Sequence, residues 1–275
     1  MAYIDPKVLE AAGFTAEVKA RRASAVVIVA GTEGTGKTHW ALTAPKPLLY
    51  QATDFGDEGV IQKASGQILR PKTGDYKLNI PHEYRAFVDR EETEAARRVR
   101  EGKLANYVHE AFYEPFWRDY KNAIDAGVRS VVWDTHLEIW EYIRLSVYGR
   151  GATNRDDLKT EANAKMKEMI RYANVHNVNL IMINRLKPKW ESYFDSTGAI
   201  KWRQSAEMEM QGFDKAPELV ALNLWSKFTP PDNWEFQVKK CRDVPSFVGA
   251  TIPMLPFVDL MGMLIPGVDA ETWES

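Results

Sequence analysis

The sequence is poor in cysteine and has no long apolar run, and each absence excludes a class of protein. Cys241 is the single cysteine among 275 residues, which excludes an internal disulfide and a multi-cysteine metal site. The five histidines are scattered without the spacing of a zinc site. No run approaches the ~20 apolar residues of a membrane span, and the N-terminus lacks the apolar stretch of a signal peptide. We therefore expect a cytoplasmic protein without structural zinc and without membrane contact.

A strong charge of either sign is also lacking. Lys and Arg total 36 against 38 Asp and Glu, which gives a formal net charge of -2. Binding to nucleic acid would therefore depend on a local patch rather than on the charge of the whole chain. The hydrophobic fraction of 45% is sufficient for one large, well-buried α/β domain.

Four short apolar runs alternate with helical segments and predict the fold class. The runs are residues 25–30, 47–52, 129–133 and 178–183. The helix before the fourth run has one apolar stripe, formed by Ala162, Met166, Met169, Ile170 and Ala173. Strands that alternate with helices indicate a mainly parallel sheet covered on both faces. Residues 218–228 and 234–240 flank a turn with two prolines and predict a C-terminal antiparallel hairpin at one edge.

The domain organisation follows from these runs. We expect an N-terminal arm at residues 1–24, one domain at 25–265 and a C-terminal tail at 266–275. Residues 57–110 are poorly patterned and are interpreted as an insertion, with a charged, solvated helix at 91–101. A further helix should begin at Pro115, because proline suits a first helical position, and should end at Gly127.

The most specific motif follows the first apolar run. It fits G-x-x-x-x-G-K-[ST] without a mismatch and consists of Gly31, Thr32, Glu33, Gly34, Thr35, Gly36, Lys37 and Thr38. Glycines let successive backbone N–H groups point at phosphate oxygens, Lys37 can reach the β- and γ-phosphates, and Thr38 can ligate magnesium. The alternative is a Gly/Thr-rich turn with a chance lysine. A buried strand before the motif and a helical segment after it favour nucleotide binding, with ATP and Mg²⁺ as ligands.

Asp134 ends the third apolar run and is the second candidate metal ligand. In a parallel sheet, ligands bind at the carboxyl ends of the strands, so Asp134 should face the magnesium held by Thr38. The alternative is that Asp134 caps the following helix, although Thr135 suits the cap better.

Polar residues at the ends of two other strands are candidate catalytic groups. Asp54 is a candidate for polarising the attacking water, with Glu58 close by; the alternative for Asp54 is an ordinary turn residue. Asn184 and Arg185 end the fourth strand, where they could sense a γ-phosphate or simply terminate the strand.

Two basic segments remain. Residues 186–215 interleave cations with aromatic residues, a pattern that suits single-stranded DNA: Lys187, Lys189, Trp190, Lys201, Trp202 and Arg203. The alternative is a β-hairpin whose aromatic residues pack on the core. Lys240 and Arg242 end the last strand and are either a solvated edge or a pair delivered to the nucleotide of a neighbouring subunit.

Together the motifs GTEGTGKT, SVVWDT, NLIMINRLKPKW and KKCRD resemble those of phage-encoded RecA-like ATPases, some of which are single-strand annealing recombinases. The resemblance covers roughly residues 25–257. It implies a RecA-like P-loop core, ATP hydrolysis, self-assembly into a ring or filament on single-stranded DNA, and cooperation with a single-strand binding protein. It assigns Asp134 as the Walker B acid, Asn184 or Arg185 as the sensor, and Lys240 and Arg242 as residues inserted into the adjacent subunit.

Two departures from this family affect the expected activity. RecA-like proteins place Glu where this chain has Asp54, so hydrolysis should be slow, and only 24 residues precede the first strand, which argues against a filament. We expect an ATPase of phage DNA metabolism, in the host cytoplasm, that binds single-stranded DNA and promotes annealing. The alternatives are a nucleotide-dependent switch or assembly protein with little hydrolysis and, less favoured, a small-molecule kinase.

Overall fold

The computed structural model describes residues 23–53, 58–72, 76–77, 79–81, 93–149, 155–194 and 196–274. Asp54 and residues 1–22 of the expected N-terminal arm lie outside these ranges. None of the described helices has the length and the apolar character needed to cross a lipid bilayer.

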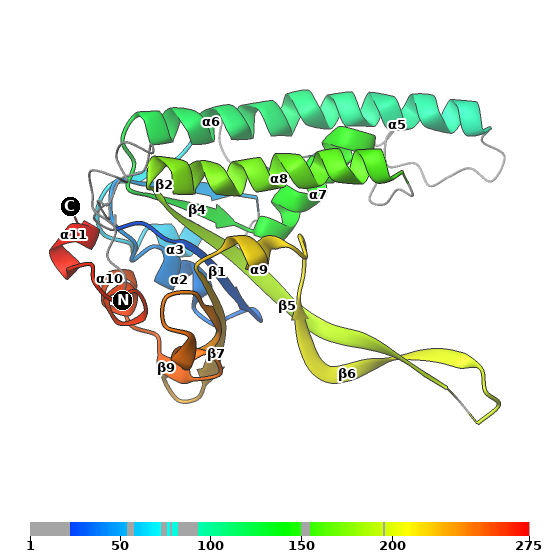
Figure 1. Cartoon of the computed structure of the whole chain (residues 1–275). Helices are drawn as coiled ribbons and strands as arrows, with labels where there is room; N and C mark the ends of the chain where they lie inside the picture. Colours follow the sequence, from blue (N-terminus) through cyan, green and yellow to red (C-terminus); the bar gives the residue numbers. More distant parts are fainter. Residues whose placement is uncertain are drawn as a thin grey trace, which may run out of the picture.

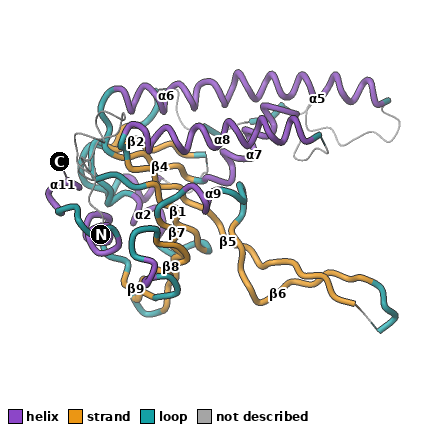
Figure 2. Tube along the Cα trace, in the orientation of Figure 1, coloured by secondary structure: helices purple, strands orange, loops and turns teal. Residues whose placement is uncertain are grey.

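A nine-stranded sheet forms the centre of the described chain, with the order β3-β2-β4-β5-β1-β7-β8-β9 and with β6 paired to β5 alone (Figures 1 and 2). The strands are β1 (Val26–Gly31), β2 (Leu48–Ala52), β3 (Ile68–Leu69), β4 (Ser130–Asp134), β5 (Asn179–Phe194), β6 (Ile200–Met210), β7 (Leu222–Thr229), β8 (Asn233–Cys241) and β9 (Thr251–Pro253). The pairs from β3 to β7 are parallel, whereas β8 and β9 add an antiparallel edge. The fold class expected from the sequence is confirmed.

Helices cover both faces of the sheet. One face is covered by α6 (Glu114–Asp125), α7 (His136–Tyr148), α8 (Asp156–His176) and the short α9 (Ala216–Leu219), and α5 (Glu94–Val108) packs against α7. The other face is covered by α2 (Lys37–Ala41), α3 (Glu58–Ile61), α10 (Phe257–Leu264) and α11 (Ala270–Glu274). Side chains of a strand alternate between faces, so Val26 and Ile28 join one core while Val27 and Val29 join the other.

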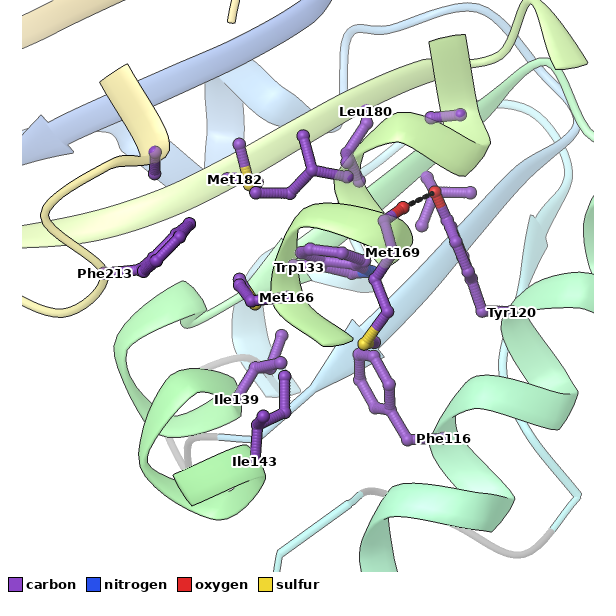
Figure 3. Close-up of a cluster of buried hydrophobic side chains, with 14 of the residues drawn as sticks. Phe116, Tyr120, Trp133, Ile139, Ile143, Met166, Met169, Leu180, Met182 and Phe213 are labelled. Atoms are coloured by element: carbon purple, nitrogen blue, oxygen red, sulfur yellow. Dashed lines mark hydrogen bonds between the residues drawn. The ribbon is translucent and has the colours of Figure 1, made fainter. Parts of the chain in front are cut away.

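Aromatic and methionine side chains fill the core beneath α6 and α8 (Figure 3). Phe116 lies 5.8 Å from Trp133 and 4.9 Å from Tyr76, measured between ring centroids, and Tyr120 donates to the Met169 carbonyl at 3.2 Å. The predicted stripe of α8 is confirmed, since all five of its residues are buried. These contacts hold β4 firmly against the helical layer, and β4 carries Asp134 at its end.

The helix expected to begin at Pro115 is instead the second half of a longer one. Residues 94–125 are helical throughout, and a π-helical segment, His109–Tyr113, joins α5 to α6. Proline has no N–H to donate, and the wider π turn before Pro115 accommodates that loss. The charged helix expected at 91–101 therefore extends further, to Val108.

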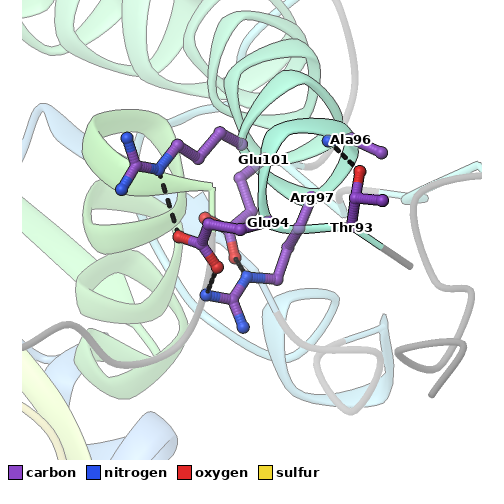
Figure 4. Close-up of polar contacts among 6 residues, drawn as sticks. Thr93, Glu94, Ala96, Arg97 and Glu101 are labelled. Carbon is purple, nitrogen blue, oxygen red and sulfur yellow. Dashed lines mark hydrogen bonds and ion pairs between the residues drawn. The ribbon is translucent and has the colours of Figure 1, made fainter. Parts of the chain in front are cut away.

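The start of α5 explains why this charged segment is helical (Figure 4). Thr93 Oγ1 accepts from the Ala96 amide at 3.2 Å, which caps the helix, and Glu94 pairs with Arg97 and Arg98 one turn on. Within the expected insertion, β3 pairs with β2 and Leu104 is buried, so these parts are integrated with the core. In the expected tail, Trp273 is fully buried, 6.1 Å from the Phe257 ring.

Replacing Phe116 by Ala should lower the free energy of unfolding by about 3–5 kcal/mol, because the ring is fully buried among other rings. Trp202→Ala should change it by less than about 0.5 kcal/mol, because the Trp202 side chain is 65% exposed. Urea denaturation followed by circular dichroism measures both. A large loss in the Trp202 variant would contradict the exposed position of this ring.

Candidate nucleotide site

The glycine-rich loop at residues 31–38 connects β1 to α2 at the carboxyl edge of the sheet. Gly34 and Gly36 have φ angles of 73° and 76°, which residues with a Cβ rarely adopt. Gly31 is required by packing, since a Cβ there would lie 2.1 Å from Ser226 Oγ. The loop therefore has the backbone curvature that the sequence motif predicts.

A hydroxyl pair fixes the loop to the neighbouring strand β7. Thr35 Oγ1 lies 2.7 Å from Ser226 Oγ and donates to the Thr32 carbonyl at 2.8 Å. Ser226 Oγ also lies 3.3 Å from the Ala30 carbonyl oxygen. Ser226 could not be predicted from the sequence, because a single serine on a strand has many ordinary roles.

Lys37 reaches back across the loop. Its Nζ donates to the Thr32 carbonyl at 2.6 Å. Burial lowers the pKa of Lys37; the nearby Asp134 opposes this shift, and Arg185 adds to it. A phosphate bound by the loop would place negative charge beside this ammonium and favour its charged form.

Asp134 and Thr38 lie together as the sequence predicts. Thr38 Oγ1 donates to Asp134 Oδ2 at 2.8 Å, and the Asp134 side chain is only 7% exposed. Tyr50 on β2 donates to the same carboxylate oxygen, also at 2.8 Å. The role of Tyr50 could not be predicted from the sequence, because a strand pattern does not show the pairing of β2 with β4 that brings Tyr50 to Asp134.

The donor set fits magnesium. A hydroxyl and a carboxylate are hard oxygen ligands of the kind that Mg²⁺ takes, together with water and phosphate oxygens. Thr38 would bind the ion directly, and Asp134 would hold it or its water ligands. Thr135, rather than Asp134, caps α7, because Thr135 Oγ1 accepts from the Glu138 amide. This leaves the Asp134 carboxylate oriented toward Thr38 and Tyr50.

The strand β5 lies between β1 and β4 and brings two further candidates to the loop. Asn184 is in register with Ala30 and Arg185 with Gly31. Asn184 is fully buried, donates to the Gln211 carbonyl at 2.7 Å and lies 3.4 Å from His136 Nδ1. Burial lowers the pKa of His136 to about 4, so its ring is neutral at pH 7. Asn184 thus connects the segment after Asp134 with the end of β6, and Arg185 lies at the loop itself.

The candidate for water activation lies outside the described residues. Asp54 follows β2, whose last residue, Ala52, is in register with Asp134. Thr53 links the segments that follow β2 and β4, since the Thr135 amide donates to Thr53 Oγ1 at 2.9 Å. Glu58 is the first residue of α3, and its side chain is not described.

Lys240 and Arg242 lie far from the glycine-rich loop, at the end of the sheet where β1 begins. Leu222 is in register with both Val27 and Cys241, so the pair lies near the start of β1, about 13 Å of strand from Gly31. Lys240 Nζ donates to the carbonyls of Pro217 and Glu218, and Arg242 donates to that of Val220. The geometry separates these residues from the glycine-rich loop of their own chain.

The expected DNA-binding segment forms a long antiparallel ribbon of β5 and β6 that projects from the body (Figures 1 and 2), here named the arm, residues 186–210. The alternative of a hairpin is right for the backbone but wrong for its aromatic residues, which do not pack on the core. One face of the arm is apolar and more than half exposed: Trp190, Phe194, Ile200 and Trp202.

Three of the four cations of the arm face carboxylates, and the fourth, Lys201, is exposed. Lys187 pairs with Glu209 and Lys189 with Glu207, each at 3.3 Å. Arg203 pairs with Glu191 at 2.8 Å and lies over the Tyr193 ring. The sequence predicted cations that neutralise phosphate, but the cross-strand register brings an acid to each of these three.

The chain resembles one protein family and a set of solved structures. The family model described as AAA domain matches residues 23–221. No significant match is found among curated proteins. A matching solved structure is that of a KaiC-like protein from the hyperthermophilic archaeon Pyrococcus horikoshii OT3, with a TM-score of 0.43, 10% identity, and coverage of 83% of this chain and 84% of that one. A structural likeness at this level carries no functional conclusion.

Tyr50→Phe should weaken Mg²⁺-dependent nucleotide binding by roughly 10- to 100-fold, because groups that orient a metal-binding carboxylate have effects of this size. The ring keeps its place in the core, so the fold should persist. Titration of Mg²⁺ at fixed ATP measures the change. Tyr107→Phe is the matched control, since Tyr107 lies on α5 and its hydroxyl donates to the Asn79 carbonyl rather than to a carboxylate of the site. Equal Mg²⁺ affinities in parent and Tyr50→Phe would show that Tyr50 does not position Asp134.

Proposed function

The chain belongs to the AAA domain family of P-loop ATPase domains, and from that premise we propose that it binds ATP at residues 31–38 and hydrolyses it with Mg²⁺. The observation that carries the proposal is the 2.8 Å contact between Thr38 Oγ1 and Asp134 Oδ2. It joins a magnesium ligand of the loop to a carboxylate two strands away. The glycine-rich loop alone would support binding, whereas this pair supports metal-assisted chemistry.

Each residue has a defined part in the proposed reaction. Loop N–H groups and Lys37 hold the β- and γ-phosphates, and Arg185 stabilises charge that develops on the γ-phosphate. Bound Mg²⁺ would neutralise phosphate oxygens in line with its usual role. Asp54, which follows β2 in the sequence, or Glu58, the first residue of α3, would orient the attacking water. An aspartate reaches less far than a glutamate, so turnover should be slow.

Lys37→Ala should weaken ATP binding roughly 10- to 100-fold, because it removes a charge-assisted contact to phosphate. Asp134→Asn should keep the fold but lose most Mg²⁺-dependent hydrolysis, because it removes the negative charge beside the metal. Calorimetric titration and phosphate release measure the two effects. Lys103→Ala, an exposed lysine on α5, is the control. Turnover equal to the parent in both variants would refute the site.

For the biological role, we propose that the arm contacts single-stranded DNA and that the protein promotes annealing of complementary strands, in phage recombination and beside a single-strand binding protein. The exposed rings of Trp190, Phe194 and Trp202 support it, because bases stack on such rings without regard to sequence. The position of Asn184 supports coupling between the arm and the nucleotide. Asn184 is in register with Ala30 on β1, and it donates to the Gln211 carbonyl just after β6. Binding should depend on stacking more than on charge, because Lys187, Lys189 and Arg203 pair with acids.

A second candidate function is a nucleotide-dependent assembly protein that uses the arm on a protein partner, with little hydrolysis. The apolar face of the arm, backed by ion-paired charges, favours it, because protein interfaces are apolar and poor in charge at their centre. Self-assembly into a ring or filament would agree with either candidate. An assembly that placed Lys240 and Arg242 beside the nucleotide of a neighbouring copy would give them a role that their distance from the loop of their own chain excludes.

Trp202→Ala should weaken binding to an oligo-dT strand about 5- to 100-fold at every salt concentration, because stacking is worth ~1–3 kcal/mol per base. Lys187→Ala/Lys189→Ala should change both the affinity and its salt slope little. Fluorescence anisotropy across a salt titration measures these effects, and ATPase assays with and without the strand measure coupling. Val175→Ala, an exposed position on α8, is the control. Normal strand binding by Trp202→Ala together with a changed oligomeric mass would favour the assembly candidate.

A further inference from the structure

An aromatic pair lies at the tip of the β7–β8 hairpin, beside the glycine-rich loop. Phe228 and Trp234 are opposite each other in the register of the hairpin, and their ring centroids are 4.3 Å apart with an interplanar angle of 36°. The Trp234 side chain is 37% exposed, although the next residue on the same face of β8, Phe236, is fully buried. The Trp234 ring therefore packs against Phe228 and is partly exposed to solvent.

Trp234 closely approaches the loop at Gly36. A Cβ on Gly36 would lie 2.9 Å from Cε3 of the indole and 3.4 Å from the Met254 sulfur. Met254 is held there because its amide donates to the Trp234 carbonyl at 2.9 Å. Gly36 directly precedes Lys37 and Thr38, so the indole and the thioether flank the part of the loop that would hold phosphate.

The sheet order indicates which end of a nucleotide would meet Trp234. The groups suited to the γ-phosphate and the metal lie on one side of β1: Arg185 on β5 and Asp134 on β4. Trp234 lies on the other side of β1, on β8, beyond β7. A triphosphate with its γ-end toward Asp134 would therefore direct its ribose and base toward the hairpin.

We propose that Trp234 stacks on the base of the bound nucleotide, with Phe228 supporting the indole and Met254 lining the same wall. This inference rests on the proposed nucleotide binding and extends it to the base. Aromatic faces stack on any base, and thioethers contact ring edges well. Trp234 would therefore select for a nucleotide over a bare polyphosphate.

The test compares Mg·ATP with Mg·tripolyphosphate, which has the phosphates but no base, by calorimetric titration. The parent should bind ATP at least about 10-fold more tightly than tripolyphosphate. Trp234→Ala should lose roughly 10- to 100-fold in ATP affinity and keep its tripolyphosphate affinity. Trp234→Phe should stay within about 3-fold of the parent, because it keeps an aromatic face. Val248→Ala, an exposed apolar side chain between β8 and β9, is the control, and thermal melts check that each variant is folded.

The outcomes separate this inference from the function on which it rests. Unchanged ATP affinity in Trp234→Ala would overturn base stacking but leave the phosphate site standing. Equal losses for both ligands would also overturn it, since the indole would then only support the loop at Gly36. If Trp234→Ala does not fold, equal affinities of the parent for the two ligands would overturn it. A parent that binds neither ligand would refute nucleotide binding itself.

Discussion

The rest of the site depends on the hydrogen bond between Thr38 and Asp134. This hydrogen bond in turn depends on the order of the strands in the sheet. Thr38 follows β1 and Asp134 is the last residue of β4, and these two strands do not touch, because β5 lies between them. Parallel pairing aligns the carboxyl ends of all three strands at one edge, so the loop, the carboxylate and Arg185 meet there. Tyr50 from β2 then fixes the carboxylate from the far side. Each contributor therefore depends on the register of its strand, which buried apolar side chains on both faces determine.

The arm begins where this edge ends. After Arg185, β5 leaves the parallel sheet and continues into the ribbon with β6, so one strand carries both the residues beside the loop and the exposed rings. Asn184 holds the carbonyl of Gln211 at the returning end. A rearrangement around a γ-phosphate would thus act on both strands of the arm at the point where they leave the body of the protein. Because three of the four cations of the arm are paired with acids of the arm, its apolar face is its most distinctive surface for a partner.

The layers of the fold and the core of the site were predictable from the sequence, because buried parallel strands are continuously apolar and the glycine-rich motif is specific. The continuity of α5 with α6 could not be predicted from the sequence, since a π turn has no reliable sequence pattern. The contacts of Tyr50 and Ser226 could not be predicted either, because they depend on the pairing between strands. The same holds for the acids opposite Lys187, Lys189 and Arg203. Cross-strand neighbours depend on register, which a single sequence does not specify. Trp234 was hidden for the same reason, since its place beside Gly36 follows from β8 lying beyond β7.

Thr38 and Asp134 are proposed to form a metal-nucleotide site. The most direct measurement is a crystal structure of the protein with Mg²⁺ and a non-hydrolysable ATP analogue. We expect the phosphates to be enclosed by residues 31–38, Lys37 to have moved from the Thr32 carbonyl to the β- and γ-oxygens, and the metal to be bound by Thr38 Oγ1 beside Asp134. An analogue bound elsewhere, with the Thr38–Asp134 and Lys37–Thr32 hydrogen bonds intact, would contradict it.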